Sequence, residues 1–110
     1  MTNSKKQRIT LQEEYDTIDK YLKLEQFCQN KPFDFEIHLP VTHDPDEIEI
    51  PPMMIQPFVE NAVFHGVSHL EEKGLIQVRF KSENEILSCE IIDNGAVSYT
   101  HLTLPTIYSV

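Results

Sequence analysis

The sequence has few basic residues for its length of 110. Nine Lys and Arg stand against 18 Asp and Glu, which gives a formal net charge of −9 at pH 7. A protein that follows nucleic-acid phosphates needs a basic stripe, and one held on an anionic membrane surface needs a polybasic segment. The charge therefore argues against nucleic acid and against a membrane surface as partners.

Cysteine and long apolar runs are scarce as well. The two cysteines, Cys28 and Cys89, form no C-x-x-C pair, so a reduced, cytoplasmic compartment is the simpler interpretation. No apolar run is long enough to cross a bilayer, and the polar start "MTNSKKQR" lacks the apolar core of a signal peptide. We expect one domain with one modest core, attached to a membrane only through segments upstream of it.

A capping box marks the start of the first expected helix. In "TLQE", the Thr10 hydroxyl and the Glu13 carboxylate can each accept a hydrogen bond from the other residue's backbone N–H. The apolar stripe of an amphipathic helix follows, at Leu11, Tyr15, Ile18 and Leu22. The pattern predicts a helix over residues 11–29, which the breaker "NKP" ends.

Three segments alternate apolar and polar residues, as half-buried strands do. They cover residues 33–39, 76–81 and 87–93. A second helix is expected after "IEIPP", with Pro52 in its first turn, Pro57 near its start and Gly66 as the C′ residue that stops it. The order helix, strand, helix, strand, strand predicts an α+β fold, with helices packed on one face of a sheet.

Asn61 is the first candidate for chemistry, because it stands in the apolar run "QPFVENAVFHG". Asn is a poor interior helix residue, and a buried amide without a partner costs about 1–3 kcal/mol. We expect this helix to be well buried, with Phe58, Asn61 and His65 on one face. The amide oxygen is a hard ligand that Mg²⁺ accepts. A hydrogen bond from Asn61 to a neighbouring loop is the alternative, and the spacing alone favours it.

Asp93 is the second candidate, because strand parity places its carboxylate on the apolar face of the strand 87–93. A carboxylate there needs a partner, and the exocyclic amine of a purine would satisfy it. Gly95 would let a flat ligand approach the backbone. The alternative is structural, since Asn94-Gly95 is also a hairpin-turn signal and an Asp at a strand end commonly bonds the turn.

Taken in order, these patterns resemble a known family. The segments "IPPMMIQPFVENAVFHG" and "CEIIDNG" are similar to the ATP-binding domain of LytS-type sensor histidine kinases. Upstream, "ITLQEEYDTIDKYLKLEQ" resembles the family's helix before that domain, with its pattern Leu-x-x-Glu…Tyr-Leu-x-(Ile/Leu)-Glu, and "FDFEIHL" also matches in place. The resemblance covers residues 9 to about 95. It implies a partial GHKL (Bergerat-type) ATPase fold, an α/β sandwich with a mixed, mainly antiparallel sheet.

The resemblance implies three parts in the chain. Residues 1–30 would be the end of a dimerisation and phosphoacceptor region, with the helix that leads into the ATP domain. Residues 31–95 would be the N-terminal part of the ATP-binding domain. Residues 96–110 would be a tail outside the family.

The resemblance also implies roles for single residues. Asn61 matches the Asn that coordinates the Mg²⁺ bridging the ATP phosphates, and Asp93 matches the Asp that accepts a hydrogen bond from the adenine amino group. Gly95 matches the glycine that makes room for the base. Glu60 matches the acidic residue beside the Asn, with a catalytic role in positioning water or Mg²⁺. His65 matches a His that faces phosphate, and a histidine satisfied at the helix end is the alternative.

As a whole, the resemblance implies the ATP-binding portion of a two-component kinase with ATP and Mg²⁺ as cofactors. The intact protein would be a homodimer that transfers the ATP γ-phosphoryl group to a His on the partner protomer. The phosphoryl group would then pass to the receiver domain of a response regulator. The alternative is a non-catalytic GHKL-type nucleotide-binding or protein-interaction fragment.

The sequence departs from the family pattern in two ways. It has no "PHF" phosphoacceptor motif, and with glycine only at positions 66, 74 and 95 it lacks the second glycine-rich box that holds the phosphates. We therefore expect this chain to be inactive alone, with weak or absent nucleotide affinity.

The final stretch also differs in composition, because every charged side chain lies at or before Asp93. "VSYTHL" is what a common transposase-adapter sequence encodes in one frame. We interpret residues 96–110 as a sequencing artefact joined to a truncated gene, with a divergent lid as the alternative.

Overall fold

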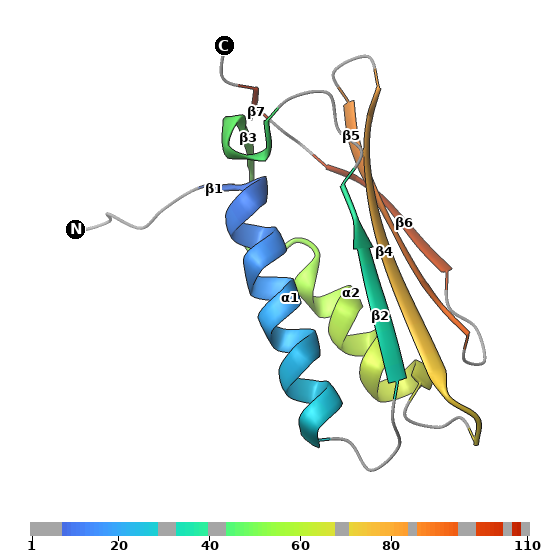
Figure 1. The fold of residues 1–110 in the computed structure, drawn as a ribbon. Coiled ribbons are helices and arrows are strands. Elements are labelled where there is room, and N and C mark those ends of the chain that lie inside the picture. Colours follow the sequence, from blue (N-terminus) through green and yellow to red (C-terminus); the bar gives the residue numbers. More distant parts are fainter. Residues whose placement is uncertain are drawn as a thin grey trace.

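Two layers make up the fold, a four-stranded sheet and the helices on one of its faces (Figure 1). The computed structural model describes residues 8–28, 33–39, 44–67, 71–83, 86–94, 99–104 and 107–108. The sheet has the order β2-β4-β5-β6, formed by Phe33–His38, Gly74–Glu83, Ile86–Asp93 and Tyr99–Leu104. Strand β2 is parallel to β4, and the other two pairs are antiparallel. The predicted α+β fold, with a mixed and mainly antiparallel sheet, is confirmed.

Helix α1, Leu11–Cys28, begins at the capping box that the sequence predicts. The Thr10 N–H donates to Glu13 Oε1 at 2.9 Å, and the Glu13 N–H donates to Thr10 Oγ1 at 3.0 Å. The stripe differs from the expectation at one place. Tyr15 is only half-buried, and the neighbouring Glu14 is 2% exposed.

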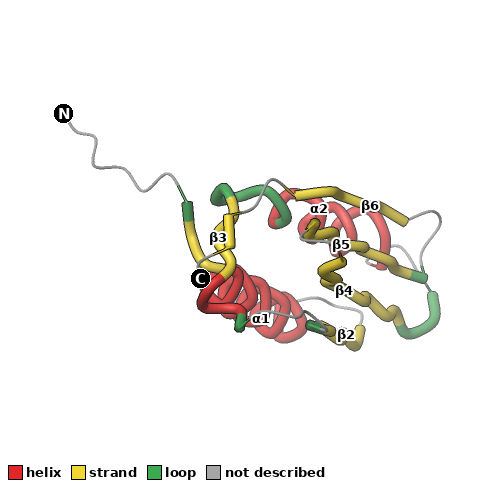
Figure 2. Tube along the Cα trace, turned by 90° about the horizontal axis from the view of Figure 1, so that it is seen from above, coloured by secondary structure: helices red, strands yellow, loops and turns green. Residues whose placement is uncertain are grey.

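A second, small sheet lies at one end of α1, beside the large sheet (Figure 2). It has the order β1-β3-β7, formed by Ile9–Thr10, Ile48–Ile50 and Ile107–Tyr108. A short 3₁₀ turn, Pro45–Glu47, precedes β3 and is capped by Asp44, whose carboxylate accepts a hydrogen bond from the Asp46 N–H at 3.1 Å. This sheet ties the start of α1 to the segment that leads into the second helix.

The second helix has two parts, the α-helix α2, Gln56–Asn61, and the π-helical turn η2, Ala62–Gly66. Pro57 lies in the first turn, as predicted. The expectation for Pro52 is wrong, because the chain first makes a turn in which Met53 has a φ of 62°, so that α2 begins only at Gln56. Gly66 is not a C′ stop either, since no described glycine has a positive φ and the turn runs on to a helical Val67.

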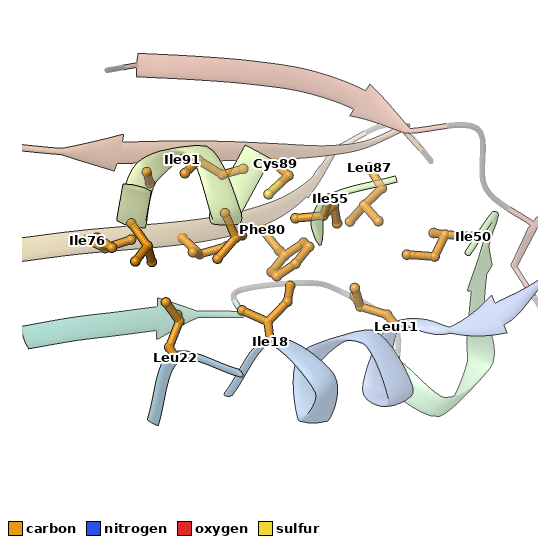
Figure 3. Close-up of a cluster of buried hydrophobic side chains, with 14 of the residues drawn as sticks. Leu11, Ile18, Leu22, Ile50, Ile55, Ile76, Phe80, Leu87, Cys89 and Ile91 are labelled. Carbon is orange, nitrogen blue, oxygen red and sulfur yellow. The ribbon is translucent and has the colours of Figure 1, made fainter. Parts of the chain in front are cut away.

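The core lies between the helices and the sheet (Figure 3). On β5, burial alternates as the sequence predicts, with Leu87, Cys89 and Ile91 facing the helices. Ile55, at the start of α2, is fully buried among side chains of both layers. In the described part of the chain, no helix is long and apolar enough to cross a membrane.

Candidate functional site

Asp93 is the last residue of β5 and is buried, at 7% exposure. It pairs across the ladder with Ile76 of β4, so its backbone is fixed in the middle of the sheet. The residues of β5 that share its face are apolar. The expectation that Asp93 points its carboxylate to the helix side of the sheet is confirmed.

The carboxylate of Asp93 packs directly against the backbone of Gly66 in the π-helical turn. A Cβ added at Gly66 would lie 2.6 Å from Asp93 Oδ2 and 2.7 Å from both Cγ and Oδ1. Real Cβ atoms do not approach so closely, so any other residue at this position would require the Asp93 carboxylate to move. Gly66 is therefore required for close approach to Asp93, and not for the helix stop that the sequence suggested.

Asn94 holds the end of β5 against the start of β4. Its Oδ1 accepts a hydrogen bond from the Leu75 N–H at 2.7 Å, and its Nδ2 donates to the Lys73 carbonyl at 3.2 Å. Its own N–H donates to the Leu75 carbonyl at 3.2 Å. Both sides of the side-chain amide are thus used to fix the residue next to Asp93. In the sequence Asn94 is only part of a turn signal, because its partners at the start of β4 lie 19 and 21 residues away.

Asn61 lies at the junction of α2 and the π-helical turn, five residues before Gly66. Its side chain is exposed and makes no capping hydrogen bond. π-helical turns inside helices occur frequently at functional sites. The Asn61 amide is therefore on the same short helical segment that touches Asp93, with its oxygen open to a ligand.

The expectation of a well-buried second helix is wrong. Asn61, Phe64 and His65 are all exposed, because only the opposite side of the segment packs on the sheet. That packed side consists of Val59, Ala62, Val63 and Gly66. An exposed amide is solvated, so burial alone does not require a ligand for Asn61.

Glu60 and Asn61 point in different directions, because successive residues on an α-helix are about 100° apart. Glu60 is half-buried and lies near Tyr21 of α1. Burial, and then the carboxylates of Glu25 and Glu60, raise the pKa of the Tyr21 phenol.

The remaining predicted site residue, Gly95, lies outside the residues that the structure describes.

A metal ion bound near Asn61 would depend on few protein ligands. In the described part of the chain, no three His, Cys, Asp or Glu side chains gather as they would in a protein cage for a metal ion. Mg²⁺ does not need such a cage, since it takes most of its ligands from water and phosphate oxygens and only one or two from the protein. The exposed Asn61 oxygen fits that kind of site.

Glu14 of α1 is the residue near the second helix that sequence analysis missed. Its side chain is 2% exposed, and its Oε2 is buried without a hydrogen-bond partner among the described residues. Burial raises the pKa of this carboxyl, and the hydrogen bond from Ile55 partly offsets the rise. The sequence held two signals. Glu14 lies three residues after Leu11 and four before Ile18, which places it on the apolar stripe, and it matches the Glu of the family pattern Leu-x-x-Glu.

Comparison with known proteins points to one family. No family model matches the chain. The sensor protein LytS of Staphylococcus haemolyticus is 35% identical over 88 residues, which cover 80% of this chain and 15% of that protein. LytS of Staphylococcus epidermidis is 30% identical over 115 aligned residues, covering 96% of this chain and 19% of that protein. The sensor histidine kinase BtsS of Escherichia coli is 29% identical over 90 residues, with 81% and 16% covered. The chain thus spans less than a fifth of the length of these relatives.

Proposed function

The chain belongs to the LytS-type family of sensor histidine kinases, and from that premise we propose that it is part of the family's ATP-binding domain. The observation that carries the proposal is the contact of the buried Asp93 carboxylate with Gly66, on the segment that also exposes Asn61. Two groups that lie far apart in the sequence are thereby brought to one side of the sheet. Each has the chemistry that one end of a nucleotide requires.

Asp93 would bind the base. Its carboxylate is a pure acceptor when ionised, and the adenine amino group is a donor. The low polarity of the surrounding core strengthens such a hydrogen bond. The tether of Asn94 to β4 supports the proposal, because a residue that reads a base must be held in a fixed position. Gly95 would leave room for the ring.

Asn61 would hold a Mg²⁺ ion that bridges the ATP phosphates, with its amide oxygen as the protein ligand. The base and the phosphates are at opposite ends of ATP, so groups separated along a helix can serve both ends. His65 would lie on the phosphate side, where its exposure permits contact with a ligand. Glu60 would position water or Mg²⁺ from the neighbouring helix position.

In the parent protein, this region would belong to a cytoplasmic kinase domain, and the protein would be a homodimer. The ATP γ-phosphoryl group would pass to a His of the partner protomer, and then to an Asp in the receiver domain of a response regulator. Phosphoryl transfer depends chiefly on positioning and on charge stabilisation, so a chain without the second glycine-rich box would lack much of the phosphate site. For this chain alone we propose weak nucleotide affinity and no autokinase activity.

Ligand-observed NMR with millimolar Mg-ATP tests the nucleotide site, because it detects weak binding. We expect saturation transfer from the protein to the adenine protons, and we expect Asp93→Asn to abolish it. Asn61→Ala should remove only the part of the binding that depends on Mg²⁺. The variant Glu71→Gln, which changes one exposed carboxylate elsewhere, is the matched control and should behave as the wild type.

Binding that survives Asp93→Asn unchanged contradicts the assignment of the base site. A radiolabel from γ-labelled ATP that becomes attached to this chain contradicts the proposed lack of autokinase activity.

A further inference from the structure

The end of the second helix lies beside the start of β4 (Figure 1). Gly74 is the first residue of β4, and a Cβ added to it would lie 2.5 Å from Val67 Cβ and 2.6 Å from Val67 Cγ1. No described glycine has a positive φ, so the backbone conformation of Gly74 does not itself require glycine. The requirement is for space, because Val67 fills the place that a side chain at position 74 would take.

The Cβ of Val67 cannot turn out of the way. It is bonded to the Cα, so rotation of the side chain about χ1 moves the two Cγ atoms and leaves the Cβ where it is. Val67 is also only 3% exposed and belongs to the core. A side chain at position 74 would therefore force the main chain of Gly74 or of Val67 to move.

The main chain at the start of β4 is held from both sides. Gly74 pairs with Phe33 of the parallel strand β2. The next residue, Leu75, donates its N–H to Asn94 Oδ1 at 2.7 Å, and its carbonyl accepts the Asn94 N–H at 3.2 Å. Because the strand is fixed between these partners, we expect Val67 to be the residue that moves.

Val67 is tied to the π-helical turn that precedes it. Its N–H donates to the carbonyls of Ala62 and Val63. It also follows directly on Gly66, whose backbone packs against the Asp93 carboxylate. A displacement of Val67 would therefore carry Gly66 with it and open the contact with Asp93.

We propose that Gly74 is a positioning residue. The space beside its Cα receives Val67, and Val67 in turn holds Gly66 against the carboxylate of Asp93. The consequence for nucleotide rests on the proposed function, in which that carboxylate binds adenine. The turn would be the wall of the base site next to Asp93, so a shift of the turn changes the shape of the site and leaves Asp93 in place on β5.

An exchange of side-chain size between positions 67 and 74 tests the contact in the protein without nucleotide. The readout is the nuclear Overhauser effect between the Gly66 Hα protons and the Asp93 Hβ protons. We expect Gly74→Ala to lose most of its intensity. Adding Val67→Gly should restore it, because the new methyl group then has room.

The matched control is Gly74→Ala combined with Val67→Ala. Val67→Ala removes both Cγ atoms but keeps the Cβ that lies 2.5 Å from the added group, so it should not restore the Overhauser effect. If Gly74→Ala does not fold, we expect only the double variant with Val67→Gly to recover a folded NMR spectrum. The positioning role is wrong if Gly74→Ala alone keeps the Overhauser effect, or if the two double variants behave alike.

Hydrogen exchange shows which side of the contact moves. In Gly74→Ala, we expect the Val67 amide to lose about tenfold in protection, while the Leu75 amide, bonded to Asn94, stays within about twofold of the wild type. The opposite result, with Leu75 exposed and Val67 still protected, would mean that β4 yields and that Gly74 does not position the turn.

Mg-ATP binding by the same variants tests the link to the base site. We expect saturation transfer to the adenine protons to fall in Gly74→Ala and to return when Val67→Gly is added. A lost Overhauser effect with unchanged saturation transfer would contradict the role of Asp93 in binding adenine, and it would leave the contact between Gly74 and Val67 in place. A retained Overhauser effect contradicts the positioning role whatever the nucleotide does.

Discussion

Helices α1 and α2 begin in different ways. At the start of α1, Thr10 and Glu13 satisfy each other's N–H groups within four consecutive residues. At the start of α2, the N-cap residue is Ile55, whose side chain forms no cap and is fully buried in the core. Two neighbouring residues of α1 differ in a similar way, since Glu13 is exposed in the capping box and Glu14 is buried. The first helix begins with a cap from its own sequence, and the second begins without one.

The ends of the second helix show the same dependence on tertiary contacts. Its approach passes through Met53 in a left-handed conformation, and its last turn is π-helical and packs on Asp93 through Gly66. Neither feature follows from helix propensity. Substitutions in the two helices should therefore differ in what they disturb.

The largest effect is expected at Gly66. In an ordinary helix, Gly→Ala stabilises by about 0.5–1 kcal/mol. Here the new Cβ would collide with the Asp93 carboxylate, so we expect Gly66→Ala to destabilise by about 2 kcal/mol. Denaturant unfolding measures the change, with His65→Ala, an exposed neighbour, as control. A Gly66→Ala variant as stable as the control would show that the Asp93 carboxylate moves away from the new Cβ without loss of stability.

The pH dependence of stability should separate Glu14 from Glu13. Because burial raises the pKa of Glu14 above its usual 4.5, the folded state holds this proton more tightly than the unfolded state. Its favourable contribution is complete below pH 4.5 and is lost as the pH rises through the raised pKa. The loss has a slope of at most about 1.4 kcal/mol per pH unit for one proton.

Glu14→Gln cannot titrate, so its stability relative to the wild type should improve as the pH rises through that window. Urea unfolding at a series of pH values measures the difference. Glu13→Gln, which removes an exposed carboxylate one residue away, controls for net charge. Parallel curves for Glu14→Gln and the wild type would argue that Glu14 is not buried in solution.

The local cap of α1 should give a smaller effect. Thr10→Ala removes the hydroxyl that accepts the Glu13 N–H, and we expect a loss of about 1 kcal/mol. Thr17 is the matched control, because its hydroxyl donates to the Glu13 carbonyl inside the same helix. Thr17→Ala should stabilise by a few tenths of a kcal/mol, since Ala has the higher helix propensity. Thermal unfolding measures the stability of both variants, and an equal loss of stability in the two would contradict the capping role of Thr10.

The smallest effect is expected at Met53. A left-handed conformation costs a non-glycine residue about 1–2 kcal/mol. A change to glycine relieves this cost, but the greater conformational entropy of glycine in the unfolded chain offsets part of the gain. We expect Met53→Gly to stabilise by about 0.5 kcal/mol, because its side chain is 59% exposed and contributes little packing. Met54→Gly, at a half-buried position against the core, should destabilise instead. Chemical denaturation measures both changes in stability. A change of the same sign for Met53→Gly and Met54→Gly would show that the turn at Met53 is unstrained.

Much of the fold could be predicted from the sequence, and the reasons are local. The capping box and apolar stripe predict the start of α1 and its course to Cys28, after which the chain is not described until residue 33. Period-two alternation predicts the burial of Asp93 on β5. These features depend on neighbours three or four residues apart in a helix, or on alternate residues in a strand. The family could be recognised for the same reason, since its motifs are short and continuous.

The candidate site could be predicted only in part. Asp93 and Asn61 were singled out by their patterns, but the exposure of Asn61 was not foreseen, because which side of a helix faces the sheet depends on packing. Gly66 looked like a helix stop, and only the position of Asp93, on a strand later in the chain, shows why glycine is needed there.

The sequence by itself determined the start of α1, the alternation of the strands and the family, because each depends on residues close together in the chain. The tertiary structure decided how the second helix begins and ends. Its N-cap residue, Ile55, forms no side-chain cap and is buried among side chains of both layers (Figure 3), and its last turn is fitted to Asp93 of β5. A partner for a buried polar group, and room for a neighbouring carboxylate, exist only once the layers have packed together.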